Sequence, residues 1–142
     1  MKRITRLFIV AVVVATFLTA CDKEPYFNYI VEGKVIDIVT NEPVSNIMVS
    51  LLRYDYLLSS AKNTQKLSPP EYDGLSDING EFRAFRTVPS SLIYFYGYEN
   101  GLYKDTTISI DFSNVQLSGK PHKNYKGDYI LNIGNILLEK IN

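Results

Sequence analysis

The 142-residue chain has little of the chemistry on which most enzymes depend, because it contains one cysteine and one histidine. A serine-type catalytic triad needs a histidine beside its nucleophile. His122 instead lies between Pro121 and Lys123, in a segment typical of a solvated loop, and no Gly-x-Ser-x-Gly motif occurs. A lone cysteine forms no internal disulfide, and one cysteine with one histidine is too few ligands for the usual zinc sites. We therefore expect no enzymatic activity, no metal and no cofactor.

The sequence also lacks an apolar segment long enough to cross a bilayer, since Leu7–Phe17 falls well short of the ~20 residues required. This segment follows a cationic start and precedes small residues, which is the order of a secretory signal. Leu18-Thr19-Ala20-Cys21 resembles the lipobox of bacterial lipoproteins. The resemblance implies cleavage before Cys21, a diacylglycerol thioether on its sulfur and acylation of its amine, so that the acyl chains anchor the protein. The alternative is an ordinary cleaved signal followed by a chance cysteine.

Neither sign of charge dominates, with 15 Lys and Arg against 15 Asp and Glu. Three of the cations, Lys2, Arg3 and Arg6, lie in the predicted signal, so the processed chain carries three net negative charges. This balance argues against nucleic acid as a partner and against a purely electrostatic attachment to a membrane.

The predicted organisation has three parts: residues 1–20 as a lipoprotein signal peptide, 21–28 as a lipidated tether and 29–142 as a single domain. Asp22, Lys23 and Glu24 follow the cysteine directly. In enterobacteria an acidic residue there resembles an inner-membrane retention signal, and in Bacteroidetes acidic residues there resemble a surface-export signal. The two interpretations stay open, and we expect the cell envelope, with the outer membrane as the address.

From Tyr29 onward, apolar and polar residues alternate with period two between turn signals, which predicts β-strands and no helix. The strand Tyr129–Ile141 contains Gly134, which predicts a bulge. Asn79-Gly80 and Asn100-Gly101 predict tight turns, the first between strands of a hairpin with adjacent positive φ angles. The long segments 55–73 and 114–128 are either functional loops or disordered. The fold class is all-β: a single antiparallel β-sandwich of about seven strands. The residues expected to face its core are Val31, Val35, Asp37, Ile47, Val49, Leu51, Phe82, Ile93, Phe95, Ile108, Ile110 and Phe112.

Two groups of motifs carry a family resemblance. Gly33-Lys34-Val35-Ile36-Asp37, a turn containing Pro43, and Ser76-Asp77-Ile78-Asn79-Gly80-Glu81-Phe82 resemble the carboxypeptidase regulatory-like, transthyretin-like module. Ser76 stands where threonine is commoner in that family. The lipobox, this module, Tyr103-Lys104-Asp105-Thr106-Thr107 and Asn124-Tyr125-Lys126-Gly127 together resemble the radical SAM-associated lipoproteins of Bacteroidetes. That likeness implies a gene neighbour and an envelope address but no reaction.

Tyrosine is the compositional outlier, with eleven in the chain. Tyr94, Tyr96 and Tyr98 alternate on one face of the strand Leu92–Tyr98, opposite Ile93 and Phe95. These rings either fill a half-buried sheet face or form an aromatic platform for a sugar or peptide.

A second candidate site is Thr106, because Asp105-Thr106-Thr107 resembles the O-glycosylation acceptor of exported Bacteroidetes proteins. The plainer interpretation is that these threonines begin a strand. Two acidic sets were also weighed. The set Asp73, Asp77, Asn79 and Glu81 lacks the spacing of an EF-hand calcium loop, and Glu71 with Asp73 is more typical of solvated charge than of a glycosidase pair.

The sequence thus predicts a lipid-anchored, non-enzymatic envelope protein that acts as a binding or interaction module, with the membrane as one partner and a glycan or peptide as another. The first alternative is a presented substrate or accessory of a neighbouring radical SAM enzyme. The second is a structural spacer.

Overall fold

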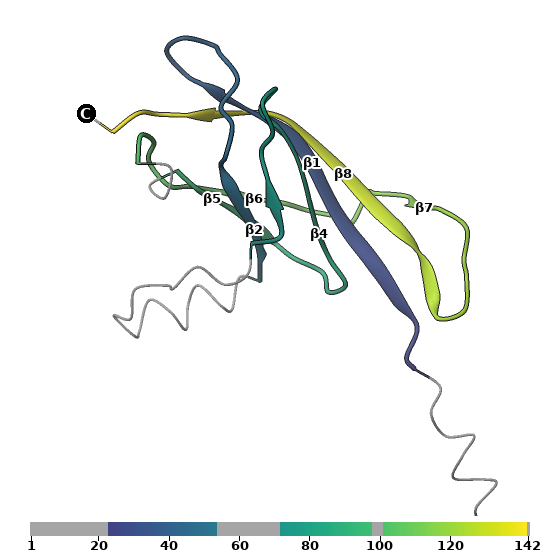
Figure 1. The fold of residues 1–142 in the computed structure, drawn as a ribbon. Coiled ribbons are helices and arrows are strands. Elements are labelled where there is room, and N and C mark those ends of the chain that lie inside the picture. Colours follow the sequence, from purple (N-terminus) through teal and green to yellow (C-terminus); the bar gives the residue numbers. More distant parts are fainter. Residues whose placement is uncertain (1–22, 54–71, 98–100, 142) are drawn as a thin grey trace, which may run out of the picture.

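The computed structural model describes residues 23–53, 72–97 and 101–141, which form two four-stranded β-sheets and contain no helix. This confirms the all-β sandwich (Figure 1). The strands are β1 (Tyr26–Asp37), β2 (Met48–Leu52), β3 (Gly74–Leu75), β4 (Glu81–Arg86), β5 (Leu92–Tyr96), β6 (Thr106–Ser109), β7 (Leu117–Ser118) and β8 (Tyr125–Leu138).

Sheet A has the strand order β4-β1-β8-β7 and sheet B the order β3-β2-β5-β6. The strand pairs are antiparallel except β1 with β8, which run parallel. The sequence prediction of an antiparallel sandwich was therefore wrong for this pair. Alternation reports which face of a strand is buried, but it does not report the direction of the neighbouring strand.

The two long strands begin earlier than the pattern predicted. β1 starts at Tyr26, inside the segment expected to be tether, and β8 starts at Tyr125 rather than Tyr129. Hydrogen bonds join the first residues of β1 to those around the start of β8. The Tyr26 N–H donates to the Asn124 carbonyl, and the Asn28 side-chain amide donates to the Asp128 carboxylate, both at 2.9 Å. The segment 114–128 is thus largely structured, with β7 and the first residues of β8 inside it.

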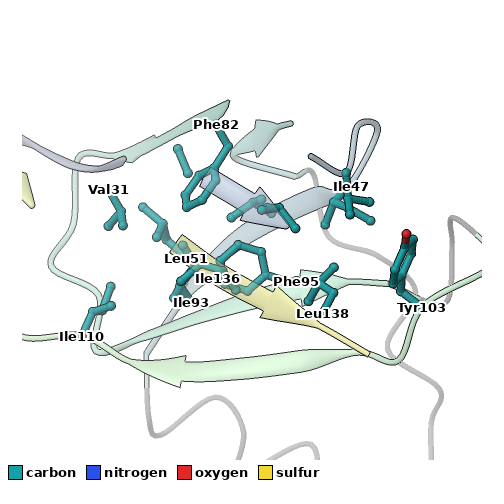
Figure 2. Close-up of a cluster of buried hydrophobic side chains, with 14 residues drawn as sticks. Val31, Ile47, Leu51, Phe82, Ile93, Phe95, Tyr103, Ile110, Ile136 and Leu138 are labelled. Carbon is teal, nitrogen blue, oxygen red and sulfur yellow. The ribbon is translucent and has the colours of Figure 1, made fainter. Parts of the chain in front are cut away.

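The core lies between the sheets (Figure 2) and consists of inward residues of β1, β2, β4, β5 and β8 together with Val44, Ile47, Tyr103 and Ile110 from the connecting segments. Phe82 from β4 meets Phe95 from β5 edge-on, with ring centroids 5.3 Å apart. Both rings are buried, as the alternation predicted. The buried cluster comprises Val31, Val35, Val44, Ile47, Val49, Leu51, Phe82, Ala84, Ile93, Phe95, Tyr103, Ile110, Ile136 and Leu138.

Gly134 forms the predicted bulge in β8. Glu32 and Lys34 of β1 pair with Asn132 and Asn135, so β8 carries one extra residue here, and Gly134 has φ +70°. The extra residue changes which positions face inward. Leu131 and Ile133 pack against the core before the bulge, and Ile136 and Leu138 join it afterwards.

The turn at residues 77–80 differs from the one predicted. Only Gly80 has a positive φ, +75°, and Asn79 does not. The Gly80 N–H donates to the Asp77 carbonyl and the Asp77 N–H to the Glu81 carbonyl, both at 2.9 Å. This is a three-residue loop closed by a bulge at glycine. Because β3 belongs to sheet B and β4 to sheet A, the turn passes the chain from one sheet to the other.

Candidate ligand-binding face

Of the predicted aromatic platform, Tyr94 and Tyr96 lie on the outer face of sheet B, and Tyr98 lies outside the described residues. The Tyr96 side chain is buried, at 6% exposure. The Tyr94 hydroxyl donates to Asp105 at 2.5 Å, and its ring is 4.5 Å from that of Tyr96. Burial and the Asp105 hydrogen bond raise the pKa of Tyr94. The Tyr96 ring is therefore covered, whereas the Tyr94 ring is half-buried with its hydroxyl bound to Asp105.

Thr106 is the first residue of β6 and pairs with Phe95 of β5. Its side chain is half-buried, whereas the neighbouring Thr107 is exposed. The threonines do begin a strand, as the plainer interpretation expected. Cys21 and Glu71 lie outside the part of the chain that the structure describes.

Two of the acidic residues considered for metal or catalysis, Asp73 and Asp77, have structural partners. Asp73 accepts the Arg86 Nε–H at 2.8 Å and the Leu51 N–H at 2.7 Å, which ties β4 to β2. Asp77 accepts the N–H groups of Asn79 and Glu81 and so shapes its own turn. No group of three His, Cys, Asp or Glu side chains suited to a metal ion occurs among the residues described.

Asp37 is a buried carboxylate, at 2% exposure, at the end of β1. It accepts the backbone N–H groups of Val39 and Thr40, the Tyr103 hydroxyl and the Lys140 ammonium group at 2.8–3.0 Å. The backbone donors, and after them Lys140 and Tyr103, hold the pKa of Asp37 well below its usual range. Both carboxylate oxygens of Asp37 already accept hydrogen bonds from these groups, so Asp37 has a structural role.

The outer face of sheet A carries side chains in three rows across β4, β1 and β8. The strand register places Glu81, Lys34 and Asn135 in the first row. Arg83, Glu32 and Asn132 form the second, and Phe85, Ile30 and Ile130 form the third. Two polar rows thus lie beside one apolar row on a single face.

The two polar rows line a groove of about 560 Å³. Its side chains comprise three carboxylates, two cations and two amides: Glu32, Asp77, Glu81, Lys34, Arg83, Asn132 and Asn135. Arg83 and Glu32 form an exposed ion pair across β4 and β1. Donors and acceptors therefore alternate along the groove.

Backbone at Gly33 and Gly134 contributes to the groove where the bulge faces β1. A Cβ atom on Gly33 would lie 2.7 Å from the Gly134 carbonyl oxygen and 3.0 Å from the Phe82 ring. Glycine at position 33 is therefore required for β1 to pass the bulge closely. The Gly134 N–H donates to the Asn132 side-chain oxygen at 2.9 Å, which fixes that amide beside the groove.

The apolar row supplies an aromatic side chain next to the groove. Phe85 is 57% exposed, whereas Ile30, its neighbour on β1, is 5% exposed. Phe85 pairs with Ile30 of β1, which pairs in turn with Ile130 of β8, more than 40 residues from Phe85 in sequence. The register that brings the three strands together became visible only in the structure.

Comparison with protein-family models, curated proteins and solved structures found no match for this chain. The resemblance to the carboxypeptidase regulatory-like module therefore stays a prediction. Over the described residues, no helix is long and apolar enough to span a membrane.

Proposed function

We propose that this protein is a non-enzymatic, lipid-anchored binding module of the bacterial cell envelope, and that it binds a carbohydrate on the outer face of sheet A. The observation that carries the proposal is the polar groove beside the exposed Phe85 ring. Its volume lies within the ~300–1,000 Å³ typical of small-ligand sites.

The groove suits a ligand whose groups both donate and accept hydrogen bonds. Sugar hydroxyls do both, and each could lie between a carboxylate such as Glu81 and a cation such as Lys34, which pair across adjacent strands. Three acids against two cations leave a small net charge, which favours a neutral ligand over a polyanion. The Phe85 ring offers an apolar surface to the C–H face of a sugar ring.

The test is retention of the detergent-solubilised full-length chain on a glycan array. Arg83→Ala and Phe85→Ala should each weaken binding about five- to tenfold, because a lost contact of about 1 kcal/mol corresponds to that factor. Lys104→Ala is the matched control, since Lys104 forms a comparable exposed ion pair, with Glu139, away from the groove. The proposal fails if the wild type binds no glycan, or if Lys104→Ala weakens binding as much as Arg83→Ala.

The alternatives give different signatures in the native host. A substrate of a radical SAM enzyme should show a mass change on the mature chain that disappears when the neighbouring gene is deleted. A hexose-sized addition lost in Thr106→Ala would instead identify the predicted O-glycosylation. A spacer should show neither a modification nor a ligand.

A further inference from the structure

The end of the sandwich nearest the predicted lipid site carries a cluster of aromatic side chains. Tyr26 and Tyr125, at the starts of β1 and β8, lie with ring centroids 5.8 Å apart. Phe27 and Tyr29 lie 5.6 and 5.3 Å from Tyr129. These five residues are the basal aromatic cluster, and Tyr26 is 44% exposed.

The connection between β7 and β8 lies at the same end as the start of β1 (Figure 1). It contains Lys120 and Lys123, and Lys126 follows as the second residue of β8. Lys120, Lys123 and Lys126 are all exposed, and the Asn124 carbonyl in this connection accepts the Tyr26 N–H. The sequence contains no acidic residue from 112 to 127. Although the processed chain is net negative, the three lysines place positive charge beside the basal aromatic cluster, where the Asp128 carboxylate is held by Tyr125 and Asn28.

Chain length limits which end of the domain can face the lipid. Tyr26 lies five positions after Cys21, so the tether reaches at most about 17 Å. β1 has 12 residues and spans about 36 Å at ~3.3 Å per residue. Val39 is exposed and lies just past the far end of β1. If β1 stands perpendicular to the membrane, Val39 is therefore held away from the bilayer.

We propose that the basal aromatic cluster and the three lysines dock onto the headgroup region of an anionic bilayer and hold the sandwich upright on its anchor. The inference rests on the proposed lipidation of Cys21. Tyrosine suits the interface because its ring is apolar and its hydroxyl is polar, and lysines attract anionic headgroups. Upright docking leaves the groove on sheet A facing sideways, open to a ligand.

The chain contains no tryptophan, so a single introduced tryptophan reports its own depth. Full-length lipidated Tyr26→Trp, Phe85→Trp and Val39→Trp are incorporated into vesicles of phosphatidylcholine and phosphatidylglycerol at 7:3 that contain brominated lipid. We expect quenching at position 26 at least twofold stronger than at 85 or 39. Equal quenching at all three positions, or the strongest at 85, overturns upright docking.

Replacing Lys120, Lys123 and Lys126 by glutamine in the Tyr26→Trp chain should reduce quenching on the anionic vesicles to the level seen on pure phosphatidylcholine. Replacing Lys34 and Lys104 by glutamine is the matched control and should leave quenching unchanged. No effect of the triple substitution contradicts the role of the lysines.

Flotation of the vesicles and intact mass separate the two proposals. A chain that floats with its acyl mass but shows no quenching at position 26 overturns docking and leaves the anchor intact. A chain that neither floats nor carries acyl mass removes the anchor, and docking with it.

Discussion

Single side chains connect distant segments at the end of the sandwich far from β1's start. Asp37 joins its own turn to Tyr103 and Lys140. Ser76, just after β3, is joined in the same way to the segment before β2: its hydroxyl donates to the Val44 carbonyl and accepts the Ile47 N–H, both at 2.9 Å. This position therefore needs a side-chain hydroxyl, which serine and threonine both supply.

The Asp37 network predicts a defined loss of stability in acid. The folded-state pKa of Asp37 is lowered, so its contribution is fully present above the unfolded pKa of about 3.9 and is lost as the pH falls below that value. Asp37→Asn should melt at a lower temperature than the wild type at pH 7, and the difference should shrink between pH 4 and pH 2. Thermal melts followed by circular dichroism measure both. Glu139→Gln, an exposed carboxylate, is the control, and equal melting of wild type and Asp37→Asn at pH 7 would contradict the assignment.

At the scale of elements, β4 shows that alternation predicts which side chains of a strand are buried but not which residues of neighbouring strands they meet. The pattern placed Phe82 inward, which the structure confirms at 4% exposure. The bulge at Gly134 was also predicted, from a glycine in a strand interior. The sequence did not predict that the bulge turns Ile136 and Leu138 toward the core. The extra residue shifts the alternation by one, so that every later residue of β8 faces the opposite side. The partners of Lys34 and Glu32 across β4 and β8 depend on register, which no local pattern encodes.

The two phenylalanines of β4 provide a test of these faces within one strand. Phe82→Ala should lower the free energy of unfolding by about 3–5 kcal/mol, because it leaves a cavity against Phe95. Phe85→Ala should change it by about 0.5 kcal/mol or less, since that ring faces solvent. Urea denaturation of both variants compares them directly. Similar losses for the two would mean that the two faces of β4 are not divided in this way.

At the scale of the whole molecule, the sequence predicted the all-β class and much of the core, because alternation is a local signal. It did not predict the parallel pairing of β1 with β8 or the groove, which depends on three strands from distant parts of the chain. The tyrosine alternation placed Tyr94 and Tyr96 together on the outer face of sheet B, but it did not predict the Tyr94–Asp105 hydrogen bond, because Asp105 comes from a separate segment.

The proposed anchor gives the whole-molecule prediction. Cys21→Ser should leave an unprocessed precursor that incorporates no radiolabelled palmitate, because the acceptor thiol is gone, while the wild type is labelled and shorter. Gel fluorography of cells grown with labelled palmitate measures both. A substitution of Ser45, in the domain, is the control. Equal labelling of Cys21→Ser and wild type would end the anchor proposal.

The parallel pairing of β1 with β8 has a mechanical consequence for an anchored protein. Under the proposed anchor, a pull from the lipid acts at the start of β1, and an opposing load on the C-terminal end of β8 acts at Leu138. These forces slide the two strands along each other, so the ladder from Tyr26–Tyr125 to Asp37–Leu138 bears the load together. Antiparallel neighbours joined by a hairpin and pulled at their ends would instead separate one hydrogen bond at a time. Under the proposed anchor, β1 and β8 would therefore share tension along the length of their ladder.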